Sequence, residues 1–323
     1  MNELETEYDE ETVLEEVEED SRFGFNRVYM IELLYKEPPL IDDELLYQKI
    51  IEHTGRTDRP LEEEMEEPEG LAVWQSNPGE AAAPGIRMFF HHHYMVEYEE
   101  GELPAQTCVL PSDQQPEMEA FETAIQQSWH WPDAGQTVSE CRYSLLLNDF
   151  CASGLPYKER LQLNNSVLRA LLETAPCDAV YFRASDKLVE PSAYLAALEE
   201  GQLLYGALNV RFYNVNREES ERSEMLVDTL GLAALGIPDV QCHYYDLEPN
   251  EIASFVGDIG YYLFHNGDII SDGETVGPTE HEKWFCEHQY ALAAPQRVVL
   301  DLNPGLEHYA GRQHHEEKDA AGQ

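Results

Sequence analysis

Short apolar runs of the strand type alternate with segments of helical periodicity along most of this chain. Residues 28–35 form a nearly unbroken apolar and β-branched run, which predicts a buried strand, and residues 158–174 carry an apolar stripe at helical spacing. Several later runs are separated only by short turn signals, which favour hairpins; residues 269–270 and 275–276, on either side of the turn signal at residues 271–274, are the strongest example. The pattern therefore predicts a mixed α+β fold with largely antiparallel sheets, ferredoxin-like (split βαβ) character and helices packed on one face.

The distribution of charge and of apolar runs divides the chain into four regions. Residues 1–22 are an acidic leader whose like charges repel one another, which favours a disordered, solvated segment. Residues 23–150 and residues 151–303 each contain the strands and helices of an α+β half, and residues 304–323 are predicted to be a polar, frayed tail. Because no Gly-rich or Pro-rich linker separates the halves, the sequence leaves open whether they are separate domains.

The net charge limits the kinds of partner. The chain has 64 acidic and 20 basic residues, which gives a formal net charge of -44. Such a charge repels phosphate backbones and anionic lipid headgroups, so we expect no direct binding to nucleic acid or to membranes. Two interpretations of the acidity stay open: recruitment of a partner with a basic surface, or solubility and life at high salt.

The chain shows no pattern typical of secretion or membrane insertion. The first twenty residues include eleven acids and no Lys or Arg, and no stretch approaches the roughly 18 consecutive apolar residues of a membrane helix. We therefore predict a soluble, cytoplasmic protein. Its six cysteines form no CxxC pair and are predicted to be reduced, mostly buried apolar residues.

The sequence contains no recognised catalytic, cofactor or metal motif, because HExxH, GxSxG, GxGxxG and Walker patterns are all absent. We therefore predict no catalytic residue, no cofactor and no metal site. His91 and His93 fall on one face of a predicted strand, but without standard ligand spacing they favour a solvated edge strand over a metal site. Residues 280–282 with His288 likewise favour a solvated polar face.

The best candidate for a ligand site is a polar cluster directly after the strand predicted at residues 179–182. Arg183, Asp186 and Lys187 lie there and carry some of the chain's scarce positive charge. Ligands often bind where the strands of a sheet end, which makes these three residues candidates for ligand binding. The alternative is a network of ion pairs within the loop, which would contribute little to stability.

Five stretches of the second half carry a family resemblance. The most specific is SDGETVG at residues 271–277, which leads to Glu282 and Lys283; the others are residues 171–182, 191–195 with 199–201, 208–213 and 258–263. Together they resemble the bacterial family of domain-of-unknown-function 4261. The start of the folded part is also similar, so the resemblance extends over residues 25–303. It implies an uncharacterised, cytoplasmic domain with no assigned catalytic residues, whose members look more like accessory or immunity-type proteins than enzymes.

These observations predict a non-enzymatic binding or immunity-type protein for a basic protein partner. Two alternatives stay open. One is an enzyme whose site is assembled in space from residues such as His91, His93, Arg183 and Asp186. The other is a structural or regulatory domain whose acidity reflects solubility or salt adaptation. The sequence does not indicate an oligomeric state.

Overall fold

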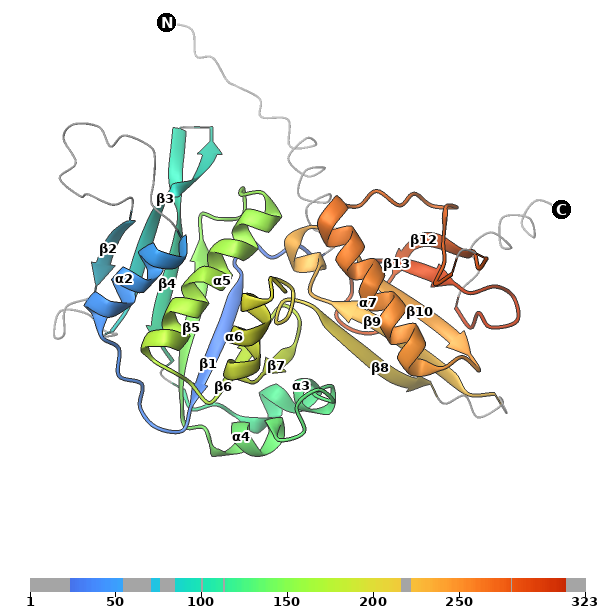
Figure 1. Ribbon diagram of the computed structural model, residues 1–323, viewed down its shortest axis with the longest axis horizontal. Coiled ribbons are helices and arrows are strands. Elements are labelled where there is room, and N and C mark those ends of the chain that lie inside the picture. The colour runs from blue at the N-terminus through green and yellow to red at the C-terminus, as the bar shows by residue number, and fades with distance from the viewer. Residues whose placement is uncertain are drawn as a thin grey trace, which may run out of the picture. The chain divides into compact units, whose positions relative to one another are not determined.

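The computed structural model describes residues 24–54, 71–75, 85–99, 101–112, 114–215, 222–279 and 281–311 (Figure 1). The acidic leader predicted at residues 1–22 lies outside the described residues. The chain divides into two compact units. The first, residues 26–209, is called the N-terminal unit, and the second, residues 210–311 together with residues 24–25, is called the C-terminal unit.

The N-terminal unit is built on a seven-stranded sheet with the order β2-β3-β4-β5-β1-β6-β7. Every strand pair described in this sheet is antiparallel. The strands are β1 (Met30–Tyr35), β2 (Leu71–Gln75), β3 (Arg87–Tyr98), β4 (Gly101–Pro111), β5 (Tyr143–Phe150), β6 (Ala179–Phe182) and β7 (Lys187–Val189). The helices are α2 (Asp43–Thr54), the 3-10 helix η1 (Met118–Phe121), α3 (Glu122–Gln126), α4 (Ala134–Glu140), α5 (Tyr157–Thr174) and α6 (Pro191–Glu199).

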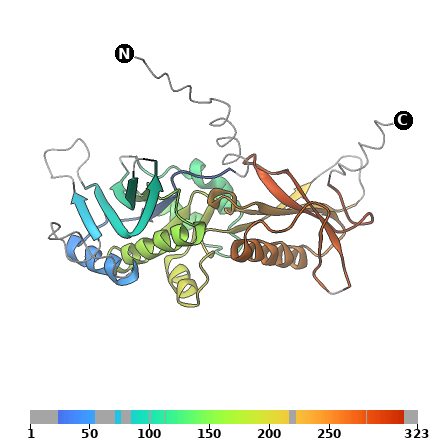
Figure 2. The same cartoon turned by 90° about the horizontal axis from the view of Figure 1, so that it is seen from above.

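Helices lie on both faces of this sheet, which corrects the expectation of helices on one face. Helix α5 packs beside α2 on one face of the sheet (Figure 2). From this helix, Arg160 donates to the buried carboxylate of Asp149 in β5. Leu34 of β1 points the other way and packs in a core cluster with Phe121 and Val138, next to α3 and α4. The alternation of side chains along a strand accounts for both contacts, since β1 is buried on each of its faces.

The C-terminal unit contains a six-stranded sheet with the order β11-β12-β13-β10-β9-β8. Its strands are β8 (Asn209–Val215), β9 (Glu224–Leu230), β10 (Asp239–Tyr245), β11 (Thr275–Val276), β12 (Trp284–Tyr290) and β13 (Val298–Asn303), with a short 3-10 helix, η2 (Ala233–Leu235). Strands β10 and β13 are parallel, and the other described pairs are antiparallel. The two sheets and their helices confirm the predicted α+β class with mainly antiparallel pairing.

Helix α7 (Pro249–Asn266) covers one face of this second sheet. Proline is suited to the first helical position because its missing N–H would have no partner there, and Pro249 occupies that end of α7. Gly267 follows the last residue with a φ of 85°, which a residue with a side chain rarely adopts. The apolar stripe of α7 packs on the sheet, where Phe255 meets Trp284 edge to face at 5.1 Å between ring centroids.

Two boundaries differ from the sequence prediction. A division at residue 150 falls inside the seven-stranded sheet, because β6 pairs with β1, so the chain divides instead after residue 209. The beginning of the predicted polar tail is also ordered along β10. There, Tyr245 N donates to His308 O at 2.7 Å, and the Tyr309 hydroxyl donates to Asp301 at 2.7 Å. Residues 312–323 lie outside the described residues.

The split βαβ unit expected among residues 23–150 is not confirmed there. Strand β1 lies between β5 and β6 and runs antiparallel to both, while α5 connects β5 to β6. The split arrangement therefore occurs across residue 150. Strands β4, β3 and β2 extend the sheet as antiparallel neighbours on the other side of β5, and β7 pairs with β6 at the opposite edge.

Candidate functional site

The structure places Arg183 and Asp186 in the tight turn between β6 and β7. Arg183 Nη2 lies 2.7 Å from Glu32 Oε2, and the Tyr181 hydroxyl donates to Asp186 Oδ1 at 2.7 Å. Asp186 adopts a φ of 47°, a left-handed conformation that Asp tolerates better than most residues. Both candidates therefore bond to neighbours within the sheet, and the guanidinium of Arg183 stays about half exposed.

Lys187, the third candidate, points into the N-terminal unit. Its ammonium group donates to the carbonyl oxygens of Tyr205 at 2.5 Å and Leu208 at 3.0 Å, and it lies 5.0 Å from the Tyr205 ring centroid. Burial lowers the pKa of Lys187 to about 8, because the charged form is poorly solvated. These contacts connect β7 to the 205–208 segment, so the ammonium group of the partly buried Lys187 is already bound to two backbone carbonyl oxygens of its own chain.

His91 is buried in β3, which is an inner strand between β2 and β4 and is not the solvated edge strand expected from the sequence. Its Nε2 lies 2.8 Å from the Thr107 hydroxyl, and burial lowers its pKa to about 3, which keeps the ring neutral. Among the residues that the structure describes, no group of three His, Cys, Asp or Glu side chains could hold a metal ion. All six cysteines are free thiols, and four of them are buried.

The residues of the possible assembled enzyme site are not brought together. Strands β3 and β6 are separated by β4, β5 and β1, which places His91 and Arg183 roughly 19 Å apart at the usual spacing between strands. Proton transfer between catalytic groups requires contact within hydrogen-bond distance or through one water. His91 and Arg183 are therefore too far apart to take part in the same proton transfer.

A different feature stands out in the C-terminal unit: an open groove of about 680 Å³ beside α7. We call it the α7 groove. It is lined by Ile259 and Tyr262 of α7, by Ile269 and Ile270 directly after the helix, and by residues 273–276. Ile259 and Ile270 are more than nine-tenths buried, whereas Tyr262 and Ile269 are 46% and 53% exposed. The floor of the groove is thus continuous with the core, and its rim offers apolar surface to solvent.

The segment that forms one wall of the groove is the SDGETVG stretch. Glu274 N donates to Ser271 O at 3.0 Å, which closes a β-turn, and Gly273 takes the positive φ of 87° that the turn requires. The sequence predicted that Ile269 and Ile270 would pair with Thr275 and Val276 across this turn. Instead β11 pairs with β12, through Thr275↔Phe285 and Val276↔Trp284. The turn is therefore held against β12, which leaves Ile269 to line the groove.

His288 of β12 forms hydrogen bonds with two aspartates of the segment that forms this wall of the groove. Its Nδ1 lies 2.7 Å from Asp272 Oδ1 and its Nε2 lies 3.1 Å from Asp268 Oδ1. The hydrogen bond with Asp268, followed by that with Asp272, raises the pKa of His288. The sequence grouped His288 with residues 280–282, but the structure brings it to the two aspartates that flank Ile269 and Ile270. Glu280 lies outside the described residues.

Sequence reasoning identified the SDGETVG turn but missed the apolar side chains of the groove. Ile259 and Tyr262 are three residues apart and so share one face of α7, a spacing that is visible in the sequence. The spacing does not show that residues 269–276 would leave this face open. Tyr262 therefore looked like any other residue of an amphipathic helix.

The face of the second sheet away from α7 carries four buried charges. Asp228 accepts from Arg211 Nη2 at 2.6 Å and from Arg297 Nη2 at 3.0 Å, and Arg297 Nε donates to Asp239 at 3.0 Å. Each of the four side chains is at most 2% exposed. Two cations balance two carboxylates, and a substrate has no access to them, so this cluster holds strands together.

Most of the Lys and Arg residues in the described ranges form ion pairs within the chain. Of the fourteen Lys and Arg residues in the described ranges, nine form ion pairs with carboxylates of other described residues. They are Lys36, Lys49, Arg87, Arg160, Arg169, Arg183, Arg211, Arg222 and Arg297. The acidic residues greatly outnumber these cations, so the carboxylates left at the surface have few neighbouring positive charges.

Residues 228–303 match the family model of a domain of unknown function, DUF4261. The match contains the SDGETVG stretch, α7 and the α7 groove, and it confirms the resemblance for this part of the chain. The stretches before residue 228 stay a prediction. No curated protein and no solved structure matched the chain. Within the described residues, no helix is long and apolar enough to cross a membrane.

Proposed function

We propose that this chain, whose residues 228–303 match the DUF4261 family model, is a non-enzymatic binding protein that masks a partner with a basic surface, as an immunity protein does. The observation that carries the proposal is that most of the described Lys and Arg side chains pair with carboxylates of the same chain. Nine of the described Lys and Arg side chains pair with carboxylates of the same chain, and each pair cancels one charge of each sign, so the excess carboxylates behind the net charge of -44 set the field felt by an approaching protein.

The physical consequence is fast, salt-sensitive association. A formal net charge of -44 attracts a basic protein over distances comparable to the Debye length, which is about 10 Å at 0.1 M salt. Complementary charge of this kind raises the rate of association more than it slows dissociation. The chain would thus capture its partner efficiently at low concentration, which suits a protein that must neutralise a harmful one.

The test is an affinity capture from lysate of the source organism at about 0.05 M and about 0.5 M salt, a range over which screening of exposed charges changes strongly. Mass spectrometry identifies the retained proteins, and stopped-flow kinetics with the purified partner then follow the association rate. We expect one basic protein that is released as salt rises, with an association rate that falls steeply over the same range. Retention of no basic protein, or an association rate indifferent to salt, would refute the proposal.

A further inference from the structure

We infer that the α7 groove binds a short segment of a protein partner in which a Lys or Arg side chain stands next to an apolar one. The inference rests on the proposed function and gives it a point of contact. The groove lies within the matched DUF4261 residues, between α7 and the SDGETVG turn. It is argued from three properties of the groove: apolar surface, negative charge and a preformed shape.

The apolar surface calls for an apolar side chain of the partner. Tyr262 and Ile269 expose about half of their surface on the rim, above a floor made by Ile259, Ile270 and Val276. Exposed apolar side chains gathered at one concave place are typical of interaction sites, whereas scattered ones are common on any surface. A volume of about 680 Å³ lies in the range of small-ligand pockets and admits a few side chains.

The charge around the groove calls for a cation beside that apolar side chain. Glu274 is exposed on the wall, and Asp268 and Asp272 lie in the same segment. Between residues 251 and 290 the sequence has one Lys or Arg, Lys283. Glu274 Oε2 accepts a bond from Ser271 N at 2.7 Å, and a carboxylate has about four acceptor sites, so Glu274 retains capacity for an ammonium or guanidinium group.

The same charge argues against other occupants. A second copy of this chain would bring a further charge of -44 to the groove, and nucleic acids and anionic lipids are repelled in the same way. An acidic peptide would place carboxylates next to Glu274. A basic and apolar peptide segment is the occupant whose two features both find a counterpart.

The groove is preformed, which lowers the entropic cost of binding. Its wall is held by backbone hydrogen bonds from Gly273 N to Cys286 O and from Cys286 N to Glu274 O, each 2.9 Å long. The two bonds of His288 to Asp268 and Asp272 add a second attachment behind the wall. A site that needs little ordering retains more of its contact energy as affinity.

The experiment titrates the full chain, carrying labelled Ile methyl groups, with two pools of capped hexapeptides. The basic pool has a fixed Arg followed by Leu, Ile, Phe or Met in randomised neutral flanks, and the second pool has Glu in place of Arg. The methyl resonance of Ile269 reports on the groove. We expect saturable shifts of Ile269 with the basic pool and none with the Glu pool.

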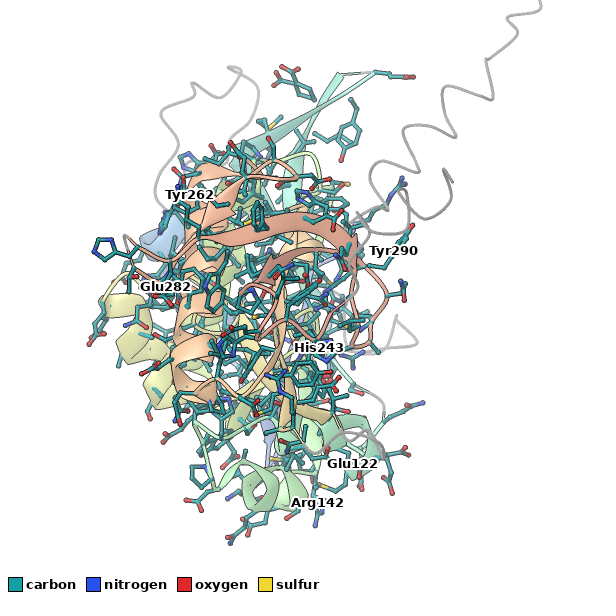
Figure 3. All side chains as sticks on the ribbon, turned by 90° about the vertical axis from the view of Figure 1, so that its right-hand side faces the viewer. Glu122, Arg142, His243, Tyr262, Glu282 and Tyr290 are labelled. Carbon is teal, nitrogen blue, oxygen red and sulfur yellow. The ribbon has the colours of Figure 1, made fainter. Side chains whose placement is uncertain are left out.

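Matched variants of exposed residues separate the groove from the rest of the surface. Tyr262→Ser should raise the dissociation constant at least about tenfold, because an aromatic contact is lost. Tyr290→Ser, which removes an aromatic 68% exposed and outside the groove, should leave it unchanged (Figure 3). Glu274→Gln should raise it about two- to fivefold, as expected for an exposed ion pair, and Glu282→Gln should not.

Each outcome has a separate meaning. Absence of Ile269 shifts with the basic pool overturns the inference, and if a basic protein is still captured from lysate, the proposed function stands without it. Equal shifts with both pools overturn the requirement for a cation. Shifts spread over acidic segments, with Ile269 unmoved, show binding by charge alone and also overturn the inference. Groove binding combined with salt-indifferent partner kinetics would instead refute the proposed function.

Discussion

Replacing Arg297 with Met tests the buried charges at the centre of the DUF4261 region. Met keeps the apolar volume of the stem but removes five hydrogen bonds. Two of these bonds go to the carboxylates of Asp228 and Asp239, each at 3.0 Å, and three go to backbone carbonyl oxygens of Thr229, Ala293 and Pro295. After the change, Arg211 still pairs with Asp228, whereas Asp239 loses the guanidinium to which it is bonded.

The magnitude follows from the loss of balance between the charges. Removing one partner of a buried ion pair costs about 3–5 kcal/mol, because the other charge is left uncompensated away from water. Asp239 keeps hydrogen bonds from Thr229 and from backbone N–H groups, so we expect a cost of about 3 kcal/mol, at the lower end of that range. For a urea dependence of about 2 kcal/mol per molar, the midpoint should fall by roughly 1.5 M.

The assay is urea unfolding followed by the fluorescence of Trp284. This residue is the one Trp of residues 210–323 and is 5% exposed in the fold, so its emission reports on the C-terminal unit. Trp74, Trp129 and Trp131 are first replaced by Phe to give a reference protein with this single reporter.

The matched control is Arg222→Met, which breaks an exposed ion pair with Asp246 whose side chains are 45% and 46% exposed. Its cost should stay below about 1 kcal/mol. The double variant Arg297→Met with Asp239→Asn should regain part of the loss, because it removes the uncompensated carboxylate. The reasoning is refuted if Arg297→Met costs no more than Arg222→Met.

Three further predictions concern other buried groups. The folded pKa of His288 is raised, so the stabilisation that protonated His288 contributes is complete below the unfolded pKa of about 6.5 and is lost as pH rises through the folded pKa. The difference in unfolding free energy between wild type and His288→Asn should therefore shrink with rising pH. Lys187 has a lowered pKa of about 8, so between about pH 8 and pH 10.4 the folded state binds fewer protons than the unfolded state. Wild type should gain stability relative to Lys187→Met across that window in pH-dependent urea unfolding. A Cβ at Gly206 would lie 2.2 Å from the ring of the buried Phe182, so Gly206→Ala should lower the free energy of unfolding by about 1–3 kcal/mol. Gly257 lies in the interior of α7, where a Cβ would meet its neighbour at an ordinary contact distance, so Gly257→Ala should raise the free energy of unfolding by up to about 1 kcal/mol. Thermal unfolding measures both.

Elements with a strong local signal were predictable from the sequence. Helix α2 has such a signal at its start, because Asp is a favoured helix cap and the side chain of Asp42 accepts from Leu45 N at 3.1 Å. Helix α4 was missed because its sequence, AGQTVSE, buries only Ala134 and Val138 and shows no apolar stripe. Strand β7 was missed because it has three residues and depends on its pairing with β6. The boundary between the units was missed because pairing of β1 with β6 is a contact across about 150 residues of sequence.

The sites show the same limit. The sequence brought Arg183, Asp186 and Lys187 together correctly as neighbours in one turn, but their partners come from other elements: Glu32 from β1 for Arg183, and the backbone of Tyr205 for Lys187. Whether a polar cluster is available to a ligand depends on such partners, which local spacing does not reveal. The SDGETVG stretch was recognised because its residues are consecutive. The α7 groove could not be recognised in this way, because it depends on where residues 269–276 lie in space relative to α7.

The placement of the cations links stability and recognition in this chain. A buried ion pair removes one positive and one negative charge from the surface, so the excess of exposed carboxylates is unchanged. Arg160, Arg211 and Arg297, the arginines with fully buried ion pairs, stabilise carboxylates in the interior and leave the exposed ones to set the outer field. Substitutions at these arginines should therefore change the free energy of unfolding and leave the affinity of the folded protein for a basic partner nearly constant. Substitutions at Tyr262 or Glu274 should have the opposite effect, because these side chains are exposed and contribute little to folding. Measuring both quantities on both sets of variants would show whether the fold and the binding surface are separable as the structure indicates.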